Sequence, residues 1–311
     1  MKMIKNVLSL FDGISCGRLA LDNVGFEYLK YYASEIDKNA NDLVSKKFPD
    51  TIQLGDVNEW LNWNLEDIDL IIAGSPCQGF SCTGNQENFN HPKSKLFYVF
   101  LEILKHYKPK YFLLENVKMR AEWIDKISDY LGVQPMVIDS SLVSAQMRKR
   151  VYWMNWSCES PEDKQIPISD ILTSNQDWNS ASISGRRIDP TTQKRSDHNK
   201  DLPYIQCVEV RQNPSKSGCL TTADKDSVIT RFKKGRHLGA YDILEQGTDW
   251  RLLDVNEIEA LQTLPKNYTE GYPVSVRRAM VGNGWTVAVI EHLLKNLQND
   301  ISHKVNKGKD D

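Results

Sequence analysis

The sequence predicts an α/β fold, with a doubly wound, mostly parallel sheet and a second, small irregular lobe. In the first half of the chain, short apolar runs alternate with stretches of helical character. Continuous apolar runs are typical of parallel strands buried on both faces, and strand–helix–strand alternation indicates a doubly wound sheet. After Ser157, turn-forming and charged residues dominate, and no clean long helical pattern appears before Val255.

The elements follow in order along the chain. Four apolar runs are the expected strands: Val7–Phe11, Tyr28–Ala33, Asp69–Ala73 and Tyr111–Leu114. The expected helices are Arg18–Val24, Ala40–Lys47, Leu96–Tyr107 and Glu122–Leu131. Two further extended runs, Pro135–Asp139 and Arg150–Trp156, leave little room for a helix between them. We therefore expect these two runs to be antiparallel neighbours at one edge of the sheet.

The second half predicts a small lobe and then a return to the main domain. Short β-like pieces are expected at Tyr204–Arg211 and Ser227–Phe232, and helices at Val255–Thr263 and Thr286–Leu297. The expected divisions are the main domain at 1–156, the lobe at 157–249, returning helices at 250–298 and a polar, frayed tail at 299–311.

Composition and charge indicate a globular protein with a local basic region. The chain of 311 residues is 40% hydrophobic and 26% charged, with a net charge of −2. The segment from Ser180 to His237 contains 12 Lys and Arg residues against 6 Asp and Glu residues, a net charge of +6. Such a region can bind phosphates on an otherwise acidic protein, and it can equally be a solvated, loop-rich surface.

Several classes of protein do not fit the sequence. The longest apolar runs are shorter than the about 18 residues of a membrane span, and the N-terminus lacks a cleavable leader pattern. A reducing cytoplasm is the expected location, and disulfides are not expected. Zinc and other metal sites are not expected, because the cysteines form no C-x-x-C pair and no histidine cluster accompanies them. The cysteines are Cys16, Cys77, Cys82, Cys158, Cys207 and Cys219.

Polar and small residues follow the first three expected strands. Asp12, Gly13 and Gly17 lie in and after the first turn, where glycines let a backbone approach a ligand. Glu35 ends the second strand and can accept both hydroxyls of a ribose, and Asp56 follows the third strand and can recognise adenine. Each acid alone is explained as well by a surface position. Together they indicate an adenosyl ligand at the carboxyl edge of the sheet.

The most specific pattern follows the fourth expected strand. The segment from Gly74 to Ser81 reads GSPCQGFS, with Cys77 between a proline and a glutamine. A lone cysteine is usually a small buried hydrophobic residue. Because Cys77 is surrounded by turn-forming and polar residues at the ligand-binding edge, an accessible thiolate is the better interpretation.

Two further polar patterns belong to the same edge. Glu115 and Asn116 end the fifth strand, which places a carboxyl group near Cys77, although an acid at the start of a helix would also fit. In the segment Gln146–Arg150, alternation would point Arg148 and Arg150 to the same side. Two guanidinium groups can bind a base oxygen, a phosphate or a carboxylate, and a solvated basic turn is the simpler alternative.

Taken in order, these segments resemble the C5-cytosine DNA methyltransferase family. They run through almost the whole chain, and the gap at about 157–249 is where that family carries its target-recognition region. Pro-Cys-Gln alone is moderately specific, but the full series in family order is hard to obtain by chance. The matching blocks are Phe11-Asp12-Gly13, Ser34-Glu35, Gly55-Asp56, Pro76-Cys77-Gln78, Glu115-Asn116-Val117, Gln146-x-Arg148-x-Arg150, Arg251–Pro265 with Glu257 and Gln262, and Gly282-Asn283.

Details of the blocks most resemble the branch that contains the animal de novo DNA methyltransferases. Because no additional chromatin-reading domain is recognisable, we expect a stand-alone bacterial or phage enzyme. Two motifs depart from the family: the usual Asp-Leu-Phe-Ala-Gly-x-Gly-Gly reads SLFDGISC from Ser9 to Cys16, and the usual Asn-Ser-Val reads Asn283-Gly284-Trp285. These departures affect the fine cofactor contacts and not the cofactor class. The resembling segments are Val7–Ile14, Tyr32–Glu35, Pro135–Ser144 and Gly282–Val287.

The resemblance implies a Rossmann-like enzyme that transfers a methyl group from S-adenosylmethionine to carbon 5 of a flipped-out cytosine in double-stranded DNA. Cys77 would add to carbon 6, which makes carbon 5 nucleophilic. Glu115 would protonate N3 or share its proton, with Asn116 positioning it, and Arg150 would hold O2. Arg148 would bind the same base or a phosphate, and either arginine would favour the Cys77 thiolate. The sequence does not identify the base that removes the C5 proton.

The resemblance also implies two sets of binding residues. Phe11 and Ile36 would flank adenine, Thr83 would fill the space that the base vacates, and Lys93 or Lys95 would contact phosphate. The cofactor set is Phe11, Asp12, Gly13, Gly17, Glu35, Ile36, Asp56, Val57, Pro76, Leu96, Asn283, Gly284 and Trp285. The DNA set is Ser81, Thr83, Lys95, Arg186, Arg187, Arg211, Thr221, Arg231 and Arg236, and each arginine can contact either a base or a phosphate.

Two alternatives to a DNA-methylating enzyme stay open. Some relatives with nearly the same catalytic blocks act on transfer RNA, but the basic region and the branch resemblance favour DNA. A catalytically silent, DNA-binding relative is the other alternative, although such proteins usually lose the Pro-Cys motif that is present here. A cognate restriction endonuclease is a candidate partner. The recognised DNA sequence and the oligomeric state do not follow from the sequence.

Overall fold

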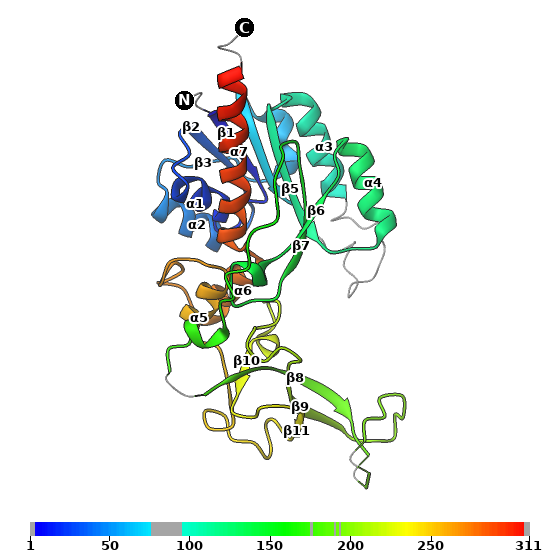
Figure 1. The fold of residues 1–311 in the computed structure, drawn as a ribbon. Helices are drawn as coiled ribbons and strands as arrows, with labels where there is room; N and C mark the ends of the chain where they lie inside the picture. The colour runs from blue at the N-terminus through cyan, green and yellow to red at the C-terminus, as the bar shows by residue number, and fades with distance from the viewer. Residues whose placement is uncertain (1–3, 76–94, 175–176, 190, 193, 308–311) are drawn as a thin grey trace. The chain divides into compact units, whose positions relative to one another are not determined.

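The computed structural model describes residues 4–75, 95–174, 177–189, 191–192 and 194–307, and the chain forms two units (Figure 1). The first unit comprises Met1–Asp139, Lys149–Glu162 and Gly284–Asp311. The second comprises Ser140–Arg148 and Asp163–Asn283.

The first unit is built on a seven-stranded sheet in the order β3-β2-β1-β4-β5-β7-β6. The five strands from β3 to β5 are parallel, and β7 is antiparallel to both β5 and β6. This confirms the predicted mostly parallel sheet and its antiparallel edge. The strands are β1 (Ile4–Leu10), β2 (Tyr28–Ser34), β3 (Ile52–Gln53), β4 (Ile68–Gly74), β5 (Tyr111–Val117), β6 (Met136–Asp139) and β7 (Lys149–Met154).

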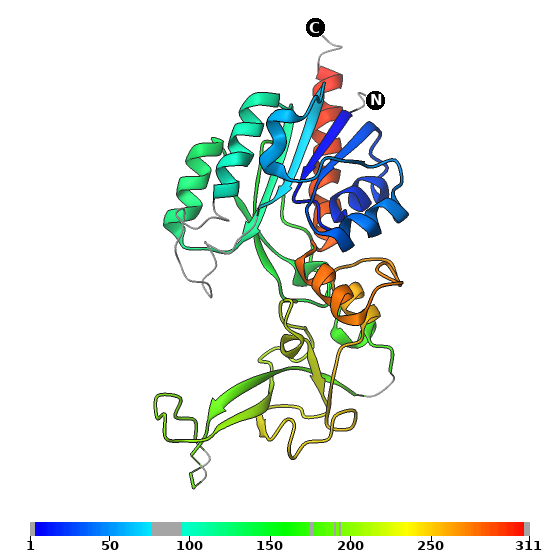
Figure 2. The ribbon, with the colours of Figure 1, turned by 180° about the vertical axis from the view of Figure 1, so that it is seen from behind.

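Helices cover both faces of this sheet (Figures 1 and 2). Figures 1 and 2 show α1 and α7 together on one face, with α3 and α4 on the other. Leu8, Ile71 and Leu114 face α3 and α4 within one apolar cluster, which explains why the strands are continuous apolar runs. The helices are α1 (Cys16–Asn23), α2 (Lys38–Lys47), α3 (Lys95–Tyr107), α4 (Ala121–Leu131) and α7 (Val287–Lys307), with a short 3₁₀ helix η1 (Val57–Asn62).

The strand order reverses at β1, which has β2 on one side and β4 on the other. From β1 the chain continues through α1 to β2, whereas β4 leads through α3 to β5. The two connections therefore leave neighbouring strands in opposite directions, and the carboxyl ends of β1 and β4 flank the usual ligand crevice of such sheets. This is the edge at which the sequence predicts an adenosyl ligand.

The second unit contains an antiparallel sheet in the order β11-β9-β8-β10-β12. The small lobe was expected to be irregular, and its longest strand, β8, was not anticipated. In that strand only Ala181 and Ile183 enter the apolar core, so its alternation is weak. The elements are β8 (Asn179–Arg187), β9 (Tyr204–Val210), β10 (Val228–Thr230), β11 (Arg236–Leu238), β12 (Trp250–Leu252), α5 (Val255–Leu261), α6 (Val274–Asn283) and the 3₁₀ turns η3 (Ser140–Leu142), η4 (Ile168–Ile171) and η5 (Asp224–Asp226).

The boundaries of the units differ from the expected ones. The expected return to the main domain is at residue 250, whereas α5 and α6 belong to the second unit and the chain returns at Gly284. A buried network explains this: the Glu257 carboxylate receives hydrogen bonds from the Arg251 guanidinium and from the Thr173 N–H, all within the second unit. Gln262 likewise donates to the Val281 carbonyl at 3.1 Å.

The C-terminal segment is more ordered than its composition suggests. A frayed tail was expected from residue 299, but α7 continues to Lys307. Ile301 is 8% exposed and follows Leu294 and Leu297 at helical spacing, so the apolar face extends past the expected end. Among the residues that the structure describes, no helix is long and apolar enough to cross a membrane. In the same residues, no group of three or more metal-ligating side chains gathers.

Candidate active site

Glu115 lies at the carboxyl edge of the sheet, near the end of β5. The register pairs it with Gly74 of β4 on one side and with Tyr152 of β7 on the other. The residue is only 7% exposed. Because both flanking strands belong to the same sheet, the carboxyl group is fixed beside the end of β4, where the segment containing Cys77 begins.

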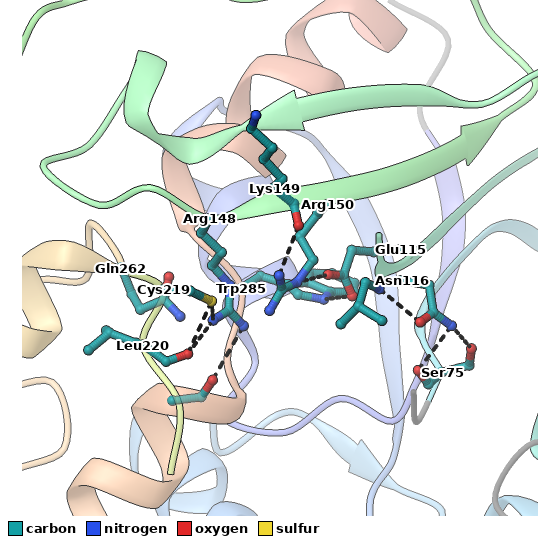
Figure 3. Close-up of polar contacts among 12 residues, drawn as sticks. Ser75, Glu115, Asn116, Arg148, Lys149, Arg150, Cys219, Leu220, Gln262 and Trp285 are labelled. Atoms are coloured by element: carbon teal, nitrogen blue, oxygen red, sulfur yellow. Dashed lines mark hydrogen bonds and ion pairs between the residues drawn. The ribbon is translucent and has the colours of Figure 1, made fainter. Parts of the chain in front are cut away.

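Two donors hold the Glu115 carboxyl group, as Figure 3 shows. Nε of Arg150 lies 3.0 Å from Oε1, and Nε1 of Trp285 donates to Oε2 at 3.0 Å. Arg150 is the second residue of β7, opposite Val117 in the register, which directs its side chain toward the end of β5. Its Nη1 also donates to the Lys149 carbonyl at 2.9 Å, so the plane of the guanidinium group is fixed. A buried carboxylate held from two sides is suited to proton transfer at a defined place.

Asn116 connects the end of β5 to the end of β4. Its amide nitrogen donates to Oγ of Ser75 at 2.9 Å, and its amide oxygen accepts from the N–H of Val117 at 2.8 Å. Both Asn116 and Ser75 are buried. The residue immediately before the predicted Pro76-Cys77 pair is thus attached to the neighbour of Glu115.

Glycines make room for the Trp285 ring at this edge. A Cβ atom at Gly74 would lie 2.8 Å from the indole Nε1, and one at Gly17 would lie 3.2 Å from Cζ3 and 2.4 Å from Cδ1 of Ile72. Larger residues at either position would displace the indole. The ring therefore lies between the start of α1, the end of β4 and the Glu115 carboxyl group.

The turn after β1 has an unusual backbone. Phe11, Gly13 and Ser15 have φ angles of +59°, +57° and +57°. These angles lie in the left-handed region, which residues other than glycine rarely adopt. The N–H of Gly13 donates to Oε2 of Glu35 at 2.8 Å. Oε1 of Glu35 accepts from the next two backbone N–H groups, Ile36 at 2.7 Å and Asp37 at 2.9 Å. Three backbone donors thus fix the Glu35 carboxylate at the end of β2.

Asp12 is bound inside the same turn. Its carboxyl group accepts hydrogen bonds from the hydroxyl groups of Ser15 and Tyr31, the latter at 2.8 Å. Burial raises the pKa of Asp12 above its ordinary value, against the opposing effect of hydrogen bonds from neighbouring hydroxyl groups. The side chain is therefore part of the support of the turn.

The remaining predicted cofactor residues of this edge differ in exposure. Ile36 is 72% exposed, an unusual environment for a large aliphatic side chain, whereas Val57 is 4% exposed. Phe11 and Leu96 pack against the apolar cluster beneath the edge. Asp56 is exposed, and its carboxylate caps η1 by accepting from the N–H of Asn58 at 2.9 Å. Of the final motif, Gly284 and Trp285 belong to the first unit, and Asn283 ends α6 in the second.

Arg148 makes its contacts inside the second unit. Nη1 donates to the Leu220 carbonyl at 2.8 Å and to Sγ of Cys219 at 3.4 Å, and Nη2 donates to the Gly282 carbonyl at 3.3 Å. The residue is 5% exposed. Its guanidinium group thus binds backbone carbonyls, whereas that of Arg150 binds Glu115.

The five arginines predicted to contact DNA have different surroundings. Arg186 and Arg236 both bind the carboxylate of Glu209. Arg187 donates to backbone carbonyls, Arg231 pairs with Asp249, and Arg211 lies half-buried over Gly218. Of the other predicted residues, Thr221 donates to Asp226 at 2.7 Å and Lys95 is an exposed first residue of α3.

Some predicted residues lie outside the described part of the chain. These are Pro76, Cys77, Gln78, Ser81, Thr83 and Lys93. Gly74 and Ser75 belong to the singled-out Gly74–Ser81 segment, although the sequence assigns them no role of their own, and Glu209 is not among the predicted residues. Ser75 and Gly74 stand beside the Pro-Cys pair in the sequence, and this proximity was a usable signal. No sequence signal indicates that Trp285 donates to Glu115, or that Glu209 binds two of the arginines.

A family model described as C-5 cytosine-specific DNA methylase matches residues 5–127 and 133–299. The chain is 29% identical over 212 residues to the orphan methyltransferase M.Rho11sI of Bacillus phage rho11s. That match covers 58% of this chain and 42% of the phage protein, so the chain spans less than half of that relative. The type II methyltransferase M.HaeII of Haemophilus aegyptius is 26% identical over 329 residues, which cover 99% of this chain and 96% of that protein.

The fold is also similar to a solved structure. The methyltransferase EhMeth of Entamoeba histolytica matches with a TM-score of 0.67 and 19% identity, over 97% of this chain and 99% of that chain. At this identity the likeness concerns the fold. Because the family model matches nearly the whole sequence, this chain belongs to the C-5 cytosine-specific DNA methylase family.

Proposed function

We propose that the protein transfers a methyl group from S-adenosylmethionine to carbon 5 of a flipped-out cytosine in double-stranded DNA. The observation that carries this proposal is the buried Glu115 carboxyl group, held by Arg150 and Trp285 at the carboxyl edge of the sheet in a member of this family. In the proposed reaction, the Cys77 thiolate bonds to carbon 6, and Glu115 supplies or shares a proton at N3. Carbon 5 becomes electron-rich and would take the methyl group as its bond to the sulfonium sulfur breaks, which leaves S-adenosylhomocysteine. Loss of the C5 proton to a base would then let the bond between carbon 6 and sulfur break and release Cys77.

The described residues support the arrangement that this reaction needs. Asn116 binds Ser75, so the segment that carries Cys77 begins beside Glu115. The Arg150 guanidinium group would hold O2 of the base, where negative charge collects as the thiolate adds. Arg148, bound to the backbone carbonyls of Leu220 and Gly282, would support the second unit rather than bind the base.

The turn after β1 and the end of β2 fit an adenosyl group. The carboxylate of Glu35 is aligned by three backbone N–H groups, which would direct it at the ribose hydroxyls. The exposed side chain of Ile36 offers an apolar surface to adenine. Gly74 and Gly17 let the Trp285 ring lie close to the backbone at this edge, since a Cβ atom at either position would meet neighbouring side chains. When bound, S-adenosylmethionine supplies the electrophilic methyl group.

A tritiated-methyl transfer assay tests the proposal. Purified protein is incubated with labelled S-adenosylmethionine and either duplex DNA or total transfer RNA, and the product is located by bisulfite sequencing of plasmid DNA from expressing cells. We expect label in DNA at cytosine, and we expect Cys77→Ser to abolish it. Label only in transfer RNA, or a C77S variant with the parental rate, would refute the proposal.

Cys158 offers a matched control. Its thiol is half-buried in the first unit, and burial together with Glu159 raises its pKa to about 11, so it is protonated at neutral pH and unfit as a nucleophile. Cys158→Ser should keep the parental rate. A loss of activity in both cysteine variants would indicate general damage and would contradict the specific role of Cys77.

A further inference from the structure

In the second unit, one carboxylate binds two arginines from different strands. Oε1 of Glu209 accepts from Nε of Arg186 at 3.0 Å and from Nε of Arg236 at 2.6 Å, and Oε2 accepts from Nη2 of Arg186 at 2.7 Å. Glu209 lies on β9, between β8, which carries Arg186, and β11, which carries Arg236. The carboxylate thus fixes both guanidinium groups from the strand between them.

This cluster lies on the sheet face opposite the core of the second unit. The core uses Ile183 of β8 and Val208 of β9, which pair in the register, and strand alternation places Glu209 on the other face. Between Arg186 and Glu209 on that face stand the small residues Ser184 and Cys207. Because these side chains are short, the Arg186 side chain can lie across the sheet to reach Glu209.

The charges of the cluster leave it cationic. Burial alone would raise the pKa of Glu209, but hydrogen bonds from Arg186 and Arg236 outweigh it and hold the pKa below its ordinary value. One carboxylate and two guanidinium groups then carry a net positive charge at neutral pH. The arginine side chains are 24% and 31% exposed, so part of each reaches solvent.

The geometry leaves a second edge of the Arg186 guanidinium plane for a ligand. Its Nε and one Nη2 hydrogen are directed to Glu209, and Nη1 donates to the Gly185 carbonyl at 3.2 Å. Because a guanidinium group has five N–H donors in a rigid fork, the second Nη2 hydrogen and one Nη1 hydrogen are left for a ligand. A fork whose plane is already fixed loses little conformational freedom on binding. Among the base edges of DNA, the one that arginine forks bind most often is the O6 and N7 pair of guanine in the major groove.

The other three arginines are held differently. Arg187 donates from Nη1 to the carbonyls of Lys200 at 2.9 Å and Leu202 at 2.6 Å, which supports a turn. Burial lowers the pKa of Arg211, and its Nη2 donates to the Asp226 carbonyl at 2.8 Å. The Arg231 side chain is 58% exposed, pairs with Asp249 and lies over the Phe232 ring, an arrangement better suited to phosphate than to a fixed base edge.

We propose that Arg186 and Arg236, aligned by Glu209, read guanine in the target site, so that the recognised sequence contains a guanine at a fixed distance from the methylated cytosine. This inference rests on the proposed DNA-methylating function. Arg186 and Arg236 are the specificity-determining residues in it, and Glu209 is a positioning residue.

Bisulfite sequencing of a plasmid library with randomised contexts tests the inference, with total tritiated-methyl incorporation measured in parallel. The wild type should require guanine at a defined position. Arg186→Gln or Arg236→Gln should reduce the preference for that guanine by roughly 10- to 100-fold. Glu209→Gln should also reduce the preference for that guanine, while total tritiated-methyl incorporation persists. Asp224→Asn is the matched control, because Asp224 pairs with Arg278, an arginine of the second unit that belongs neither to the cluster nor to the predicted DNA set; it should leave the context unchanged.

If a variant folds poorly, a change in the DNA substrate tests guanine recognition in the wild-type protein. Replacing the required guanine by 7-deazaguanine removes the N7 acceptor and should lower methylation about 10-fold or more. A wild type without a required guanine, an unchanged rate on 7-deazaguanine, or an unchanged context in folded variants would each overturn the inference and leave the proposed function standing. A protein that methylates no DNA would overturn both.

Discussion

Trp285 donates its indole N–H to Oε2 of Glu115 at 3.0 Å, across 170 positions of sequence. The donor is the second residue of the segment that returns to the first unit, and the acceptor lies near the end of β5. With Arg150 on the other oxygen, the carboxyl group is held from two sides. The position of the Glu115 carboxyl group therefore depends on the returning segment, and under the proposed function Trp285 would be a positioning residue in addition to its predicted place beside the cofactor.

Trp285→Phe should lower kcat about 10- to 100-fold, because it removes a hydrogen bond to a buried carboxyl group while retaining an aromatic ring. KM values for DNA and S-adenosylmethionine should change much less. Steady-state kinetics measure both. Trp153→Phe is the matched control: it removes an indole hydrogen bond of 2.9 Å to Ser128 in the same unit and should leave kcat unchanged. Equal losses in both variants would contradict the role of Trp285.

Gly74→Ala should disturb the same contact from the opposite side. The added Cβ would lie 2.8 Å from the indole Nε1, so the ring must move away from Glu115. We expect a loss of kcat comparable with that of Trp285→Phe, with a cooperative unfolding transition retained. In a double-mutant cycle, Gly74→Ala should cost little once Trp285→Ala has removed the ring. Additive losses would show that Gly74 acts through something other than the indole.

Glu35→Ala should weaken the binding of S-adenosylmethionine about 10- to 100-fold, since it removes a charged acceptor that three backbone N–H groups align. Isothermal titration calorimetry measures the affinity without turnover. Glu27→Ala, an exposed acid just before β2, is the control and should bind as the parent does. Unchanged affinity in the Glu35 variant would remove this residue from the cofactor site.

The Glu257 network should make stability depend on pH. Burial would raise the pKa of Glu257, but hydrogen bonds from Arg251, Thr173 and Asp254 outweigh it and hold the pKa below its ordinary value. A depressed folded-state pKa stabilises the protein above the unfolded-state value, about 4.3 for Glu, and that stabilisation is lost as the pH falls below it.

Glu257→Gln should therefore reduce the free energy of unfolding by about 3–5 kcal/mol at pH 7, because it leaves the Arg251 charge without its buried partner. Urea denaturation at pH 7 and below pH 4 measures the difference between parent and variant. The difference should shrink at the acidic pH. A difference that does not vary with pH would mean that the ionised carboxylate is not what stabilises this network.

The strand-end residues of the candidate site could be placed from the sequence alone. Apolar runs such as Asp69–Ala73 and Tyr111–Leu114 mark buried parallel strands, and the residues that follow them fall at one edge by topology. Glu115, Glu35 and Gly13 were located in this way. The strand β8 is not predicted from the sequence, because only Ala181 and Ile183 of its nine residues enter the apolar core, which leaves little periodic signal.

What the sequence by itself determined was the sheet, its carboxyl edge and the residue types that stand there, because periodicity and chain order are local properties. Only the tertiary structure decided which side chains meet. Trp285 reaches Glu115, and Glu209 binds Arg186 and Arg236, through strand register and packing between segments far apart in the chain. The return of the chain at Gly284 was settled in the same way, since the buried partners of Glu257 and Gln262 hold α5 and α6 in the second unit.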